Sequence, residues 1–106
     1  MAWIQKEFDS YKLWHAPGSS PVTVASIECF KTGIRVGALF FYNDNIALPP
    51  NENHQTLGIR LYLHASRFKD VIDTVRQEKP LYLMLETVSL NGWLTTNDTE
   101  PVGEEE

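Results

Sequence analysis

The sequence predicts an α+β fold in which one helix packs on one face of a mostly antiparallel β-sheet. Three observations carry this prediction: an alternating strand, a helical stripe that follows it directly, and two hairpin signals. The alternating segment has apolar residues at every second position, namely Leu57, Ile59, Leu61, Leu63 and Ala65. The next segment spaces its apolar residues as the buried stripe of a helix does, at Phe68, Val71, Ile72 and Val75. A strand that leads directly into such a helix indicates that the helix lies against the sheet.

The helix is predicted to span about Arg67 to Glu78. Ser66 precedes it as a candidate N-cap, and Pro80 marks its end. Burial of its four apolar side chains on the aliphatic face of the sheet should contribute roughly 1.5–3 kcal/mol each before entropy is counted. The segment Leu81–Leu90 is apolar on both sides up to its middle, which predicts a second strand after the helix.

Two short polar segments have the composition of hairpin turns. Thr32-Gly33 separates the apolar segments Val22–Lys31 and Ile34–Asn43, which are predicted to pair antiparallel. Asn91-Gly92 is typical of a two-residue turn, and Trp93–Thr96 would form the short return strand.

The remaining segments complete a sheet of five to six strands. Trp3–His15 has a weak alternating pattern, and Asp44–Thr56 is a connection long enough to be functional or to dock on the domain. The pattern is compatible with an open sheet and with one that curls toward a barrel. Residues 1–97 are expected to form a single domain, because 106 residues are too few for two separate cores.

Residues 98–106 are predicted to be an acidic C-terminal tail. The chain has a net charge of −5, and four glutamates lie in this tail, namely Glu100, Glu104, Glu105 and Glu106. The domain itself is therefore nearly neutral, and its nine lysine and arginine residues are scattered along the sequence. Nucleic acid and anionic membranes are not expected partners, because phosphate binding needs clustered positive charge.

The cysteine content and the N-terminus favour a cytoplasmic location. Cys29 is the single cysteine, so the chain cannot form an internal disulfide. No basic region followed by an apolar run opens the chain, and no apolar run is long enough to span a bilayer.

The sequence contains no recognisable catalytic or metal-binding constellation. The potential metal ligands His15, His54, His64 and Cys29 lack the close spacing of a zinc site, so no metal or cofactor is expected. Cys29 stands among apolar residues and is interpreted as a small buried side chain.

Acid–base catalysis would require a pair of carboxylates in a shared cleft. Glu28 and Glu86 are the only candidates within predicted strands, and both are interpreted as marking solvent-exposed ends of sheet faces. No serine lies in a nucleophile-elbow pattern. An enzymatic activity therefore has no residue pattern to support it.

One predicted sheet face has the composition of a protein interface. If the helix covers the aliphatic face, the opposite face is expected to present Trp14, Arg35, Phe41, Arg60, Tyr62, Tyr82 and Met84. Aromatic residues, methionine and arginine are enriched at protein interfaces. We therefore expect a non-enzymatic module that self-associates, most simply as a two-fold homodimer, or binds a protein partner. The alternative is a barrel-like protein in which the same aromatic residues line a pocket for a small molecule.

Overall fold

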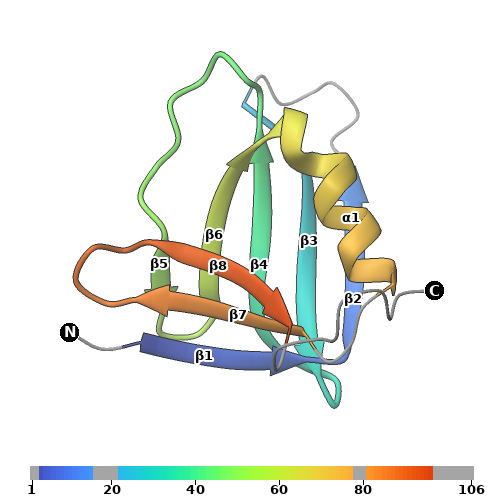
Figure 1. Cartoon of the computed structure of the whole chain (residues 1–106), viewed down its shortest axis with the longest axis vertical. Coiled ribbons are helices and arrows are strands. Elements are labelled where there is room, and N and C mark those ends of the chain that lie inside the picture. The colour runs from blue at the N-terminus through green and yellow to red at the C-terminus, as the bar shows by residue number, and fades with distance from the viewer. Residues whose placement is uncertain (1–2, 16–21, 78–80, 97–106) are drawn as a thin grey trace, which may run out of the picture.

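The computed structural model describes residues 3–15, 22–77 and 81–96 of the chain. These residues form eight strands, a 3₁₀ turn and one α-helix (Figure 1). The strands are β1 (Trp3–Phe8), β2 (Ser10–His15), β3 (Thr23–Lys31), β4 (Ile34–Tyr42), β5 (Glu52–His54), β6 (Gly58–His64), β7 (Leu81–Glu86) and β8 (Gly92–Thr96). The 3₁₀ turn η1 (Ala65–Arg67) leads directly into the helix α1 (Phe68–Gln77).

The strands are arranged in two sheets. The larger sheet has the order β2-β3-β4-β6-β5, and the smaller has the order β1-β7-β8. All pairs of neighbouring strands are antiparallel except β4 and β6, which run parallel. The chain passes from one sheet to the other at Asp9, between β1 and β2, where the Asp9 N–H donates to the Phe30 carbonyl over 2.9 Å.

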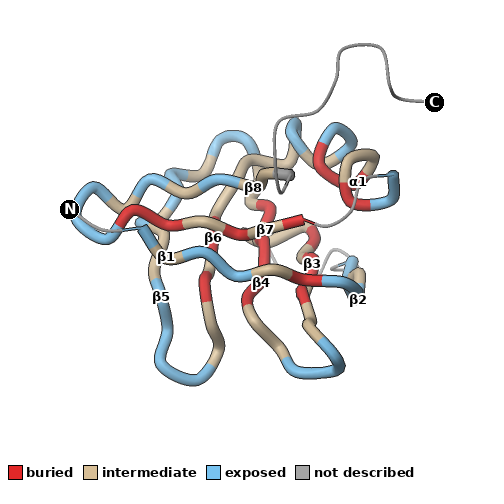
Figure 2. The backbone as a smooth tube through the Cα atoms, turned by 60° about the horizontal axis from the view of Figure 1, so that its bottom comes forward, coloured by how far each residue is buried: buried red, intermediate tan, exposed pale blue. Residues whose placement is uncertain are grey.

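The core lies between the two sheets and the helix. In Figure 1 the three-stranded sheet and α1 lie on the same side of the five-stranded sheet, whose strands they cross. We call this side the inner face and the opposite side the outer face. The five-stranded sheet contributes Ala25, Ile27, Cys29, Leu39, Phe41, Ile59 and Leu61 to the core. Phe8, Leu81, Leu83 and Leu85 come from the three-stranded sheet, and Val71, Ile72 and Val75 from α1. Figure 2 shows these buried segments meeting in the middle of the molecule.

The predicted α+β class, with a mostly antiparallel strand arrangement and one helix, is confirmed. The prediction of one sheet was wrong in detail, because β6 and β7, which flank the helix in sequence, belong to different sheets. Alternation identifies a buried face but does not tell which of two facing sheets a strand joins. The acidic tail predicted for residues 98–106 lies outside the described residues.

The predicted helix is present with slightly different ends. It begins at Phe68 after the 3₁₀ turn, so Ser66 lies inside that turn and is not the N-cap. The Ser66 N–H instead donates to the carboxylate of Asp44, a residue outside the helix, over 3.0 Å. Within the described residues the helix extends to Gln77, and Glu78 lies outside them.

One of the two predicted hairpin turns is confirmed and the other is wrong. Thr32 and Gly33 both have positive φ, 49° and 81°, and join β3 to β4 directly. At the second hairpin β7 ends at Glu86, and the positive φ of 63° falls on Leu90. The turn is therefore wider than predicted and lies before Asn91. Within it the Leu90 N–H donates to the Glu86 carbonyl over 2.8 Å.

A β-bulge in β4 decides which side chains reach the outer face. Cys29 pairs with Gly37 and Phe30 pairs with Arg35, so Val36 has no partner on β3. The extra residue shifts the alternation by one position. Val36 consequently packs against the core, and Arg35 lies on the outer face beside Glu28.

Gly58 is required where the parallel strands β4 and β6 begin their pairing. Its φ is +82°, and a Cβ atom at this position would collide with the Val36 carbonyl. Gly33 has nearly the same φ, +81°, but a Cβ atom there would meet no atom within 4 Å. A side chain at Gly33 would therefore meet only backbone strain, whereas one at Gly58 would meet the same strain and a steric collision as well.

We predict that Gly58→Ala lowers the free energy of unfolding by about 3 kcal/mol or more, because it adds a collision to the strain of a positive φ. Gly33→Ala should cost only about 1 kcal/mol, the strain alone. Urea denaturation of both variants measures the difference. Equal losses would contradict the close approach of β4 and β6 at Gly58.

Candidate functional site

The outer face of the five-stranded sheet gathers aromatic and charged side chains from four strands. They alternate with the core residues along each strand, as the pleat requires. The side chains that concern us are Lys12 and Trp14 from β2, Glu28 from β3, Arg35, Phe40 and Tyr42 from β4, and Arg60 and Tyr62 from β6. We call this set the outer-face cluster.

The aromatic part of the cluster is a continuous stack across β4 and β6. Phe40 is the register partner of Tyr62, and their rings stack with centroids 5.4 Å apart. Tyr42 meets Tyr62 edge to face at 5.6 Å. The Arg60 guanidinium lies 4.7 Å from the Phe40 centroid, and such cation–π contacts hold an arginine in place. Burial among these groups raises the pKa of Tyr62 above its usual value.

Glu28 holds the charged part of the cluster together. Its carboxylate accepts hydrogen bonds from the Trp14 indole over 2.7 Å and from the Arg35 guanidinium over 2.6 Å. The Glu28 side chain is only 18% exposed, so its interpretation as the solvent end of a sheet face was wrong. It bridges three strands and fixes the orientation of Trp14. The Lys12 ammonium also lies over the Trp14 ring, 4.4 Å from its centroid.

A hollow of about 450 Å³ opens between the two halves of the cluster. Its lining residues include Trp14, Glu28, Arg35, Phe40 and Arg60. The Nε atoms of both arginines are buried, and neither has a hydrogen-bond partner among the described residues. The hollow therefore combines aromatic walls with guanidinium groups that are held in position by Glu28 and Phe40.

The structure brings four of the seven predicted interface residues together, namely Trp14, Arg35, Arg60 and Tyr62. Phe41 is fully buried on the inner face, so its assignment to an accessible face was wrong. Its neighbours Phe40 and Tyr42, which the sequence prediction missed, occupy the outer face instead. The register of β4 with β6 reveals this, and the sequence of β4, apolar on both faces, does not.

The other two predicted residues, Tyr82 and Met84, lie on the three-stranded sheet. Tyr62 and Tyr82 are therefore on different sheets. Met84 is the register partner of Trp93, whose ring centroid lies 6.5 Å from that of Trp3. Trp3 and Trp93 are about half exposed, and the sequence prediction assigned neither to a surface. This second cluster surrounds a hollow of about 280 Å³.

The potential nucleophile and metal ligands have structural roles. Cys29 is fully buried, as predicted, and burial raises the pKa of its thiol to about 12. His54 Nδ1 accepts hydrogen bonds from the Thr56 and Leu57 N–H groups, both over 3.2 Å. His64 Nε2 lies 2.8 Å from the Ile46 carbonyl oxygen. Within the described parts of the chain, no three His, Cys, Asp or Glu side chains are grouped as metal ligands.

Comparison with known proteins adds no relative. The chain matches no family model, and neither the curated proteins nor the solved structures contain a significant match. Over residues 3–15, 22–77 and 81–96 there is no helix long and apolar enough to cross a membrane.

Glu86 is buried at the end of β7, so its interpretation as a solvent-exposed position was also wrong. Hydrogen bonding from the Ser89 side chain, together with the Ser89 N–H that donates to the carboxylate over 2.6 Å, lowers the pKa of Glu86 from its usual value of 4.5. A group whose pKa is lowered by folding stabilises the native state above its unfolded pKa. This contribution is lost as the pH falls through the native pKa.

We therefore expect Glu86→Gln to lower the free energy of unfolding at pH 7. The variant should also lose less of this free energy than the wild type as the pH falls below about 4.5. Urea denaturation between pH 3 and pH 7, compared with the wild type, measures both effects. If both proteins lose stability in parallel over that range, Glu86 does not anchor the turn as a carboxylate.

Proposed function

We propose that this chain is a non-enzymatic binding module that forms a two-fold homodimer through the outer-face cluster. The three-stranded sheet and α1 both lie on the opposite side of the five-stranded sheet (Figure 1). The cluster contains tryptophan, tyrosine and arginine, the residue types that dominate the energetics of protein interfaces. Glu28 and Phe40 already hold Trp14, Arg35 and Arg60 in place, which reduces the entropy lost on association.

A row of charges across the sheet carries the proposal of a second copy as the partner. The pairing registers align Lys12 with Glu28, Glu28 with Ala38, Ala38 with Arg60, and Arg60 with Glu52. From β2 to β5 the charges along this row are therefore positive, negative, neutral, positive and negative. Read from the opposite end, every sign is exchanged, and the neutral position stays at the centre.

This row is complementary to itself under one particular two-fold rotation. An axis parallel to β4 that passes over Ala38 turns a second copy face to face and reverses its row. Lys12 of each copy then opposes Glu52 of the other, and Glu28 opposes Arg60. A two-fold interface requires a surface that complements itself, and this row satisfies the requirement. An axis along the row would oppose like charges and is disfavoured.

The two half-exposed tryptophans on different sheets provide a matched test of the surface. Trp14 is 49% exposed on the outer face, and Trp93 is 54% exposed on the three-stranded sheet. We expect Trp14→Ser to weaken dimerisation by about thirty-fold, the effect of losing an interface hot spot. Trp93→Ser should change it less than two-fold, roughly the limit for a residue outside the interface. Sedimentation velocity over a concentration series measures both.

Equal weakening by the two tryptophan variants would contradict the choice of surface. A wild-type protein that sediments as a monomer at every concentration would contradict self-association.

The self-complementary row predicts a rescue by charge exchange. Lys12→Glu and Glu52→Lys should each weaken the dimer by about ten-fold, because each opposes like charges across the two-fold axis. The double variant restores opposite charges across the axis and should regain affinity over either single variant. It stays weaker than the wild type, because the ion pair of Glu52 with Arg60 in the same chain, 3.6 Å, is lost. The same sedimentation experiment measures the dimer affinity of the three variants. It is done at low salt, because high salt screens exposed charge pairs and would hide the effect. Additive losses in the double variant would contradict the proposed axis.

A further inference from the structure

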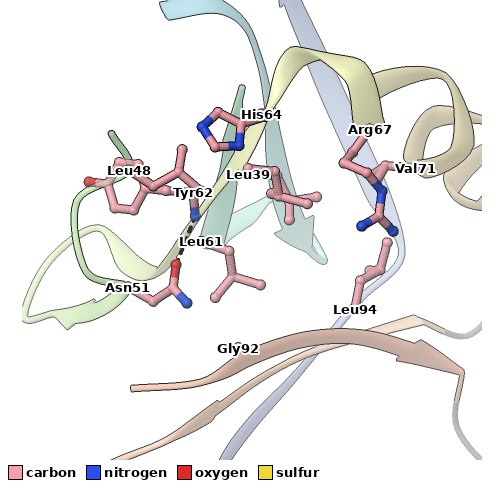
Figure 3. A pocket seen from close by; sticks show the side chains of 11 residues that line it. Leu39, Leu48, Asn51, Leu61, Tyr62, His64, Arg67, Val71, Gly92 and Leu94 are labelled. Carbon is pink, nitrogen blue, oxygen red and sulfur yellow. Dashed lines mark hydrogen bonds between the residues drawn. The ribbon is translucent and has the colours of Figure 1, made fainter. Parts of the chain in front are cut away.

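A further cavity, distinct from the two hollows described above, lies on the inner side of the fold, where β6, β8, α1 and the segment before β5 meet (Figure 3). Its volume is about 280 Å³. The lining side chains are mostly aliphatic, and include Leu39, Leu48, Leu61, Leu63, Val71 and Leu94. A cavity with such walls favours an apolar ligand body, and this volume is close to the lower limit of small-molecule sites, roughly 300 Å³.

The connecting segment that forms one wall is anchored at three points. The Asp44 carboxylate accepts the Ser66 N–H over 3.0 Å, and the Ile46 carbonyl lies 2.8 Å from His64 Nε2. Asn51 accepts the Tyr62 N–H over 2.8 Å and donates to the Leu90 carbonyl over 3.0 Å. The wall is therefore formed before any ligand enters, which reduces the entropic cost of binding.

Arg67 differs from the other polar residues of the cavity wall. The Asn51 amide is already occupied at both its oxygen and its nitrogen, and His64 is engaged with Ile46. Arg67 is the one lining residue with a permanent charge, and it forms no ion pair with any other described residue. Figure 3 shows its side chain beside Val71, extending toward Leu94 at the edge of the cavity.

We propose that this cavity binds an aliphatic carboxylate of medium chain length. The hydrocarbon chain would lie among the leucine side chains, and the carboxylate would accept paired hydrogen bonds from the Arg67 guanidinium. An apolar pocket with one guanidinium at its edge matches an amphipathic anion, because arginine pairs with carboxylates in a two-pronged geometry. Tyr62 lines this cavity and also belongs to the outer-face cluster, but Arg67 and the aliphatic wall lie outside that cluster, so the proposal does not rest on the outer-face dimer.

Titration calorimetry with decanoate, below its micelle concentration, tests the proposal. We expect saturable binding of one decanoate per chain. Arg67→Gln should weaken it by about ten-fold or more, since a hydrogen-bonded charge pair contributes at least that factor. Arg76→Gln is the matched control, because Arg76 is an exposed arginine of α1 outside the cavity lining. Decan-1-ol, which has the chain without the charge, should bind wild type and Arg67→Gln equally.

No saturable decanoate binding to the wild type would overturn the site. Decanoate binding that Arg67→Gln leaves unchanged, or that Arg76→Gln weakens equally, would overturn the role of Arg67. The Trp14→Ser variant should bind decanoate like the wild type, so the failure of the dimer proposal and the failure of this one are distinguishable. Circular dichroism of the Arg67→Gln variant checks that it is folded, which the exposure of Arg67 leads us to expect.

Discussion

The parallel pairing of β4 with β6 is the constraint on which the rest of this structure depends. The two strands approach closely where Gly37 faces Ile59, and a Cβ atom on Gly37 would collide with the Ile59 backbone and with the Leu83 side chain of the opposite sheet. The absence of a side chain at Gly37 thus allows both the neighbouring strand β6 and the facing sheet to approach closely. From this point the register places Leu39 beside Leu61 in the core. It places Ala38 beside Arg60 and Phe40 beside Tyr62 on the outer face.

A second irregularity adds the charged half of the outer-face cluster. With regular alternation Arg35 would share the inner face with Leu39, where a guanidinium would need a buried partner. The bulge at Val36 turns Arg35 outward to Glu28, which also accepts the Trp14 indole. One local change in β4 therefore orients side chains of β2, β3 and β4. The charge row and the aromatic stack therefore result from the registers between paired strands, which the sequence of a single strand does not reveal.

The sequence predicted what depends on neighbouring residues and missed what depends on pairing. The alternation from Leu57 to Ala65 and the helical stripe from Phe68 to Val75 are local patterns, and both elements form where expected. Phe41 was assigned to the accessible face because β4 is apolar on both faces, so that only its partners decide which face is buried. Tyr82 and Met84 were grouped with Tyr62 because sequence order does not reveal that β6 and β7 enter different sheets. Asn91-Gly92 failed as a turn because the buried Glu86 carboxylate favours a wider one.

The most direct test of the account is a dilution series followed by the three tryptophan indole signals in a two-dimensional ¹H–¹⁵N NMR spectrum. Trp14 belongs to the proposed interface, whereas Trp3 and Trp93 belong to the other sheet, so the chain contains its own reference probes. We predict that the Trp14 indole signal moves with concentration while the other two stay in place. A shift of Trp3 and Trp93 with a stationary Trp14, or three signals that do not respond at all, would contradict it.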